Sequence, residues 1–151
     1  MQNEKTVEIL NDLVMINNDR IEGYRRAINE AKDLDVDLKA TFEGLERESE
    51  GHKQELIEHI RKHGGSVAPG TTTSGKIYRA WMDVKATFTG HDRKAILASC
   101  EFGEDAAQRA YEAALGDEGL DADSRPLVSE QRRSLKNSHD LIKRYRDSHD
   151  R

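Results

Sequence analysis

The sequence predicts an all-α protein: an up-down-down-up four-helix bundle with one long crossover that contains a short helix. Three observations predict it. Apolar residues recur every three or four positions along four long segments, the spacing of a helix face that turns toward a core. The alternation of β-branched and aromatic residues typical of strands is absent. The connection between the second and third segments is much longer than the other two.

The first two predicted helices cover about residues 4–31 and 37–63. The inward positions of the first are Val7, Leu10, Val14, Asn17, Ile21, Tyr24, Ile28 and Ala31. The inward positions of the second are Leu38, Phe42, Leu45, Ser49, His52, Leu56 and Ile60. The run HGGSVAPG ends the second helix, because glycine suits a helix C-cap and proline follows it.

The run KIYRAWMDVKATFTG comes next and predicts a short crossover helix that packs its aromatic residues, Trp81 among them, against the bundle. The remaining long helices are predicted over about residues 92–115 and 125–148, with Ser124 as a cap and Pro126 in the first turn of the last. Short loops make antiparallel neighbours, and one long crossover gives the ferritin-like arrangement. Residues 1–151 have the length of a single domain.

The charge of the chain excludes some classes of function. The formal net charge is −5, so no basic footprint for nucleic acid is expected. The basic runs EQRRSLK and IKRYRDSHDR are interleaved with other polar residues and predict solvated helix faces. Charged residues make up 35% of the chain and apolar residues another 35%, which predicts a thin core with a charged coat.

Cysteine content and hydropathy predict a soluble cytoplasmic protein. Cys100 is the only cysteine, so an internal disulfide is impossible; we expect a small core residue in a reducing compartment. No apolar run is long enough to span a bilayer, and the start MQNEKTVEILND has no apolar signal-peptide region. Neither a membrane nor a nucleic acid is an expected partner.

Polar residues interrupt the inward faces near the middle of each long helix. At about 100° per residue, the inward polar side chains are Asn17, Ser49, His52, Glu104, Gln131 and Ser138, with His139 on the flank. We expect His52 to supply the partner that a buried Glu104 needs, and the hydroxyls of Tyr24 and Tyr111 to complete the hydrogen bonds. The sequence therefore predicts a core polar layer made of Asn17, Tyr24, Ser49, Tyr111 and Gln131 around these groups.

This layer can be compared with a di-iron site, which takes one Glu from each of two helices and a Glu-x-x-His pair from each of the others. Asn17 and Ser49 stand where carboxylates are needed, and Lys136 faces outward. The pattern predicts a degenerate site with no catalytic residue and no bound cofactor. The alternative is a divalent iron, zinc or manganese ion. Its candidate ligands are His52, Glu104 and His139.

Five further polar residues are predicted to lie outside the site. Glu22, Glu48 and Glu101 fall well away from the inward faces of their helices, so we expect them in solvent. His59 and His63 share one helix face but have no obvious third ligand in the sequence, so we expect surface or helix-end histidines. A third interpretation of the chain is a protein-interaction module that binds a partner or a second copy.

Several runs resemble an uncharacterised bacterial family of ferritin-like four-helix bundles. They are ILNDLVMINNDRIEGYRRA, HKQELIEHIRKHGGS, APGTTTSGKIYRAWMDVKA and AILASCEFGEDAAQRAYEAAL. The most specific parts are GED at 103–105 followed by Tyr111, and IYRAW after the glycine-rich loop. The resemblance covers nearly the whole chain. It implies a ferritin-like bundle and no assigned activity.

Overall fold

The computed structural model describes residues 2–30, 36–67, 76–84 and 93–150. They form α1 (Gln2–Glu30), α2 (Val36–Lys62), α3 (Lys76–Val84), α4 (Arg93–Gly116) and α5 (Arg125–Asp150). No strand occurs within these ranges. The all-α class is confirmed, and the predicted boundaries of the four long helices lie within a few residues of the observed ones.

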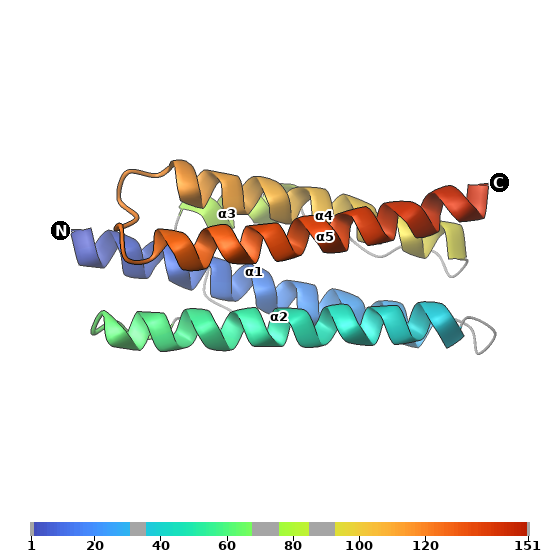
Figure 1. The fold of residues 1–151 in the computed structure, drawn as a ribbon, viewed down its shortest axis with the longest axis horizontal. Helices are drawn as coiled ribbons and strands as arrows, with labels where there is room; N and C mark the ends of the chain where they lie inside the picture. Colours follow the sequence, from blue (N-terminus) through green and yellow to red (C-terminus); the bar gives the residue numbers. More distant parts are fainter. Residues whose placement is uncertain (1, 31–35, 68–75, 85–92, 151) are drawn as a thin grey trace.

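The helices are arranged as two antiparallel pairs. α1 packs chiefly against α2, and α4 packs against α5 (Figure 1). α4 runs in the same direction as α2, so the up-down-down-up order is confirmed. α3 lies against α1 and α4, which places the crossover on the outside of the bundle.

The core is divided into two apolar clusters along the bundle. One includes Leu10, Ile16, Leu56, Ala107 and Val128, and the other includes Ala27, Phe42, Leu45, Ile96 and Ile142. The buried Val, Leu, Ile and Phe side chains among them each contribute about 1.5–3 kcal/mol. Cys100 lies in the second cluster and is buried, as expected of a small core residue.

The observed helix ends match the expected signals. Gly64, just after α2, has a φ of 76°, and the nitrogen of Gly65 donates to the carbonyl of Ile60 at 2.9 Å, so the glycine cap is confirmed. At the start of α5 the carbonyl of Ser124 accepts from Val128, as a cap residue does. Ser124 therefore stands at the cap position directly before α5, where the sequence predicts it.

The crossover helix is held on α1 by two aspartates. Trp81 Nε1 and the Tyr78 hydroxyl both donate to Asp19 Oδ2 at 2.9 Å, which confirms that these aromatics pack on the bundle. Asp12 Oδ2 accepts from the backbone nitrogen of Tyr78 at 3.3 Å, in the first turn of α3. Burial raises the pKa of Asp12 to about 6, although these backbone bonds oppose the shift. Residues 85–90 of the predicted crossover lie outside the described residues.

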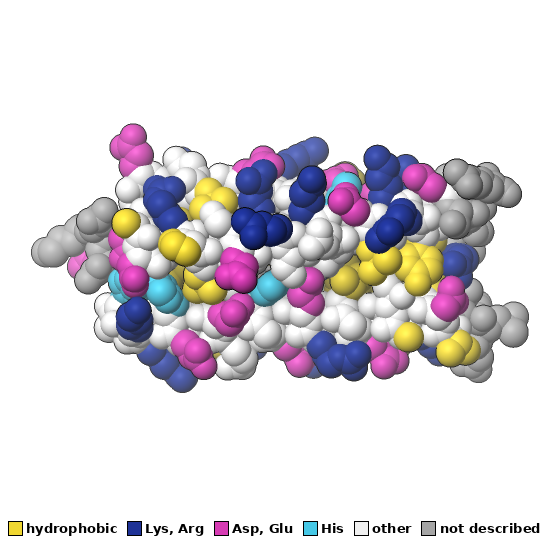
Figure 2. All heavy atoms as spheres, in the orientation of Figure 1, with side chains coloured by type: hydrophobic (Ala, Val, Ile, Leu, Met, Phe, Trp, Pro, Cys, Tyr) yellow, Lys and Arg dark blue, Asp and Glu magenta, His cyan; other side chains and the backbone are white. Residues whose placement is uncertain are grey.

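The surface carries both signs of charge. The face seen in Figure 2 shows Lys and Arg side chains interspersed with Asp and Glu over all the visible helices. Such mixing is typical of a solvated coat and differs from a continuous basic stripe. None of the helices in the described part of the chain is long and apolar enough to cross a membrane.

Candidate functional site

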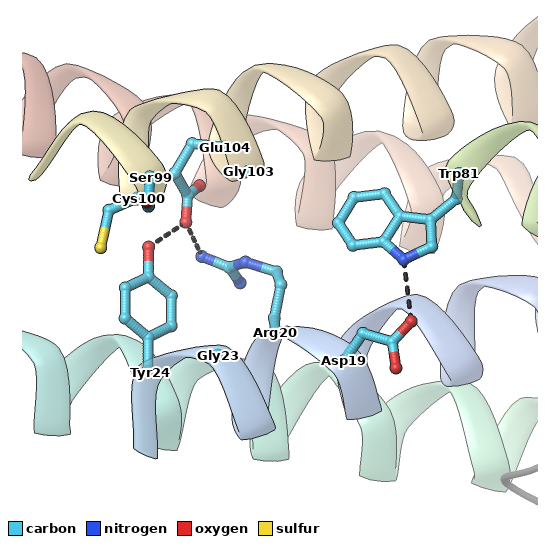
Figure 3. Close-up of a pocket in the computed structure, with 9 residues that line it drawn as sticks. All are labelled: Asp19, Arg20, Gly23, Tyr24, Trp81, Ser99, Cys100, Gly103 and Glu104. Carbon is cyan, nitrogen blue, oxygen red and sulfur yellow. Dashed lines mark hydrogen bonds and ion pairs between the residues drawn. The ribbon is translucent and has the colours of Figure 1, made fainter. Parts of the chain in front are cut away.

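An arginine occupies the middle of the bundle. The Arg20 guanidinium, on α1, donates to Glu104 Oε1 on α4 at 2.5 Å (Figure 3). It also donates to Ser49 Oγ on α2 at 2.5 Å. Arg20 is 5% exposed and Glu104 is 1% exposed. A buried ion pair of this kind is held by charge-assisted hydrogen bonds.

The same Glu104 oxygen also accepts a hydrogen bond from the Tyr24 hydroxyl. Burial raises the pKa of Tyr24 well above its usual value, and the negative charge of Glu104 raises it further, so the phenol keeps its proton. Burial alone lowers the pKa of Arg20, but Glu104, Tyr24 and Glu48 together outweigh that effect, so the pKa is raised. The guanidinium therefore stays charged.

Glu48 brings α5 into this network. Its carboxylate accepts from Ser134 at 2.7 Å and from Ser138 at 2.8 Å, and it lies 3.4 Å from Arg20. The expectation that Glu48 is solvated is wrong, because its side chain is only 21% exposed and faces these donors. We name the set Arg20, Tyr24, Glu48, Ser49, Glu104, Ser134 and Ser138 the arginine network; it joins all four long helices.

The other two acids that we placed in solvent differ from each other. Glu22 is exposed, as expected. The side chain of Glu101 is 16% exposed and lies 2.6 Å from the Arg146 guanidinium, so the solvated interpretation is wrong there. Glu101 lies on α4 and Arg146 lies on α5. The long Arg146 side chain reaches the Glu101 carboxylate across the contact between these two helices.

A second, neutral network lies one turn away. The Tyr111 hydroxyl donates to Gln131 Oε1 at 2.7 Å and accepts from Asn17 Nδ2 at 3.0 Å. Gln131 Nε2 in turn donates to the backbone carbonyl of His52 and to Glu55 Oε1, both at 3.1 Å. We call Asn17, Tyr111 and Gln131 the amide network. The five residues expected in one layer are all buried, but they divide between the two networks.

The three candidate metal ligands take separate partners. Glu104 is bound by Arg20 and Tyr24, whereas His52 Nδ1 lies 3.6 Å from Glu55, so the expected pair of His52 with Glu104 is not formed. His139 lies on the flank, where its Nε2 is 2.6 Å from Asp105. Burial lowers the pKa of His52, which favours a neutral imidazole.

The residues at the midpoint do not fit a dinuclear metal centre. Within the described ranges, two groups of three potential ligands lie close enough to share an ion: His59, His63 and Asp123, and Glu101, Asp105 and His139. Neither group contains His52 or Glu104. Arg20 already lies against both central carboxylates, Glu48 and Glu104, and its positive charge repels a divalent cation at that point.

Arg20 is the central residue that sequence reasoning missed. It stands three residues after Asn17 and four before Tyr24, so it shares their face of the helix. The three-to-four-residue spacing assigned the inward position to Ile21, which is also buried, and so passed over Arg20 beside it. The inward position of Glu104 on another helix was the available signal for a buried cation, since a buried carboxylate requires a cationic or hydrogen-bonding partner.

A small cavity adjoins the ion pair. Its volume is about 50 Å³, and it is lined by the residues labelled in Figure 3: Asp19, Arg20, Gly23, Tyr24, Trp81, Ser99, Cys100, Gly103 and Glu104. Ligand sites usually have volumes of about 300–1,000 Å³, so this space suits water rather than a substrate. Burial raises the pKa of Cys100, which keeps the thiol protonated and unreactive.

Comparison with known proteins gives the family and the fold. Residues 5–117 match the family described as Domain of unknown function (DUF2383), and the chain belongs to that family. No curated protein matches the sequence. The chain is similar in structure to a Mycobacterium smegmatis Dps1 mutant, with a TM-score of 0.81 and 13% identity over 96% of this chain and 97% of that one. The resemblance to a ferritin-like family of unassigned function is confirmed.

Proposed function

We propose that this DUF2383 protein is a non-catalytic ferritin-like bundle, in which the arginine network takes the place of a central metal site. One observation carries the proposal: a charged guanidinium, supplied by Arg20, holds the two carboxylates that a metal ion would need. The fold is then used as a rigid helical module rather than as a metal oxidase.

The charge balance of the network supports this role. Glu104 and Glu48 are neutralised by a cation of the chain itself, and hydroxyl groups supply hydrogen bonds to the same carboxylates. Buried polar groups of this kind specify which helices pair and in which register. The arginine network therefore stabilises one arrangement of four amphipathic helices against alternatives.

Iron oxidation tests the proposal directly. Purified protein given iron(II) in air is expected to oxidise it no faster than protein-free buffer. Arg25→Ala, which removes an exposed ion pair on the same helix as Arg20, is the control for the core variants named next. Iron retained at one or more ions per chain, and lost in His52→Ala and Glu104→Ala, would contradict the proposal. That result would support the alternative of a divalent-metal protein that uses His52, Glu104 and His139.

A protein-interaction role is the second candidate, and one observation favours it. Phe102 on α4 is 52% exposed, which is unusual for a large apolar side chain. We propose a second copy or a protein as the partner, in the cytoplasm, and no nucleic acid or membrane. Light scattering across a range of concentrations tests this role: the mass should rise with concentration, and Phe102→Ser should abolish the rise.

A further inference from the structure

Two histidines and two aspartates meet where α2 ends. His59 and His63 lie one helical turn apart, with ring centroids 4.8 Å from each other. The loop between α4 and α5 carries Asp121 and Asp123 to the same place, about 60 residues further along the chain. Figure 2 shows histidine side chains at this end of the molecule, in the seam between the two pairs of helices.

We propose that His59, His63 and Asp123 form a binding site for a divalent transition-metal ion of the Zn²⁺ class, with Asp121 beside it. The site lies at the end of the bundle, away from the arginine network. Imidazole and carboxylate are ligands that zinc prefers, and three protein ligands with one open position make a common zinc arrangement.

The distances between the ligand atoms are close to those of a zinc site. Asp123 Oδ2 lies 3.5 Å from His59 Nε2 and 3.9 Å from His63 Nε2, and all three atoms lie within 4.8 Å of one another. Bonds of the usual length put two ligand atoms of a tetrahedral zinc about 3.3–3.6 Å apart. The three side chains therefore need to move inward by less than about 1.5 Å, which changes of side-chain torsion supply.

His63 is already oriented as a metal ligand. Its Nδ1 donates to the backbone carbonyl of His59 at 2.9 Å, and this directs Nε2 toward the two aspartates. Histidines that bind metals usually donate the other ring nitrogen to a carbonyl or carboxylate in this way. Nε2 also donates to Asp121 Oδ2 at 2.7 Å, so an ion that binds Nε2 displaces this proton to solvent and keeps the Asp121 carboxylate beside it as negative charge.

The opposite side of the site is anchored as well. Asp121 Oδ1 accepts from the backbone nitrogen of Ser124, and the nitrogen of Asp121 donates to Thr6 Oγ1, both at 2.9 Å. Thr6 also donates to the carbonyl of Gly119 at 3.0 Å, which fixes the loop on α1. The loop is therefore held in position before any ion binds.

His59 Nε2 has an unmet hydrogen-bonding capacity. The atom is buried and makes no hydrogen bond among the described residues, although the Asp123 oxygen lies near it. The Asp123 side chain is 56% exposed, so the site is open to ions from solvent. Lys62 Nζ lies 3.5 Å from Asp123 and is the cation that competes for it.

The other group of potential ligands is less suitable. Glu101, Asp105 and His139 also lie within 4.8 Å of one another. The Arg146 guanidinium, however, lies 2.6 Å from a Glu101 oxygen and supplies the positive charge that an ion would bring. At the proposed site, the nearby lysine or arginine that the structure describes is Lys62. Its Nζ lies 3.5 Å from Asp123, and its side chain is largely exposed.

Zinc titration of the full-length protein tests the proposal. Protein freed of metal with a chelator and titrated with ZnCl₂ in a calorimeter should bind one ion per chain, and its Tm should rise. His59→Gln and Asp123→Ala should each weaken binding about tenfold or more. Lys62→Ala should strengthen it, because the competing cation is gone. Cobalt(II) in place of zinc should give the intense visible absorption of a tetrahedral ion.

The matched control is Glu118→Ala, which removes an exposed acid from the same loop and should leave the affinity unchanged. Absence of zinc binding would overturn the proposal. So would binding that Asp123→Ala and His59→Gln leave intact, or that Glu118→Ala weakens equally. Binding lost only in His52→Ala or Glu104→Gln would place the ion in the core, and would contradict both this proposal and the proposed function.

Discussion

The acids in the middle of the bundle and the acids at its end have different partners. In the middle, Glu104 is paired with Arg20, a permanent cation that is part of the chain. At the end, Asp121 and Asp123 face His59 and His63, which carry no permanent charge. The comparison teaches that a side-chain cation such as Arg20 excludes a metal ion from the carboxylates it binds. Imidazoles that face carboxylates, as at the end of the bundle, can bind a cation from solvent together with them.

Replacement of Arg20 is expected to give the largest loss of stability, and it tests the role of the cation in the middle of the bundle. Arg20→Met leaves Glu104 buried without its cation, so the free energy of unfolding should fall by about 3–5 kcal/mol. Urea denaturation measures the change. Arg25→Met, which removes an exposed ion pair on the same helix, should lower the free energy of unfolding far less, because solvent screens that pair. Equal losses in the two variants would show that the buried pair has no special role.

Zinc provides the next largest effect and tests whether the two regions are independent. At a free concentration of about 100 times the dissociation constant, zinc should add about 2.7 kcal/mol to the stability of the folded protein. The gain should be the same in Arg20→Met as in the unmodified chain, since the two sites share no residue. A gain that appears only when Arg20 is present would show that the regions are coupled.

The amide network should give a smaller change than the arginine network. Tyr111→Phe removes the hydroxyl that joins Gln131 to Asn17, and Asn17 keeps its bond to the carbonyl of Leu13. The free energy of unfolding should fall by about 1–2 kcal/mol, the cost of buried groups left without a partner. Tyr145→Phe, which removes a partly buried hydroxyl near the other end of α5, is the control. A loss as large as that of Arg20→Met would contradict the ranking.

The smallest effect concerns pH and the crossover helix. The pKa of Asp12 is about 6 in the folded state and 3.8 in the unfolded chain, so the folded state holds its proton more tightly. Its contribution to stability is present below pH 4 and is lost as pH rises through 6. Asp12→Asn should remove this dependence of stability on pH.

Thermal melts of both proteins between pH 4.5 and 7 measure that dependence, with Glu43→Gln as the control for an exposed acid. The Tm of the Asp12→Asn protein and the Tm of the unmodified chain should therefore change differently with pH. If the two Tm curves stay parallel over this range, Asp12 does not titrate there.

The helical periodicity of apolar residues in the sequence predicted much of the fold. The predicted inward residues of the second helix, from Leu38 to Ile60, are all buried, because one face of a helix repeats every three to four residues; Ile57 is buried as well. The glycine run after His63 ended the helix as expected. These features depend on neighbouring residues, so the local sequence contains the information.

Part of the site was readable for the same reason. Asn17, Ser49, Glu104 and Gln131 were placed inward by their angle on the helix, and each is buried. The ionic partner of Glu104 was not predicted. The guanidinium of Arg20 reaches Glu104 from another helix, and a helical wheel gives neither the reach of a long side chain nor the distance between helices.

The sequence by itself determined four amphipathic helices, their order, the crossover and the inward polar residues, because these follow from helical period and chain connectivity. Only the tertiary structure decided that Arg20 neutralises Glu104 and that Asp123 approaches His59 and His63. The physical reason is that electrostatic pairing depends on distances of a few ångströms between residues far apart in the chain. Those distances exist only once the helices have packed.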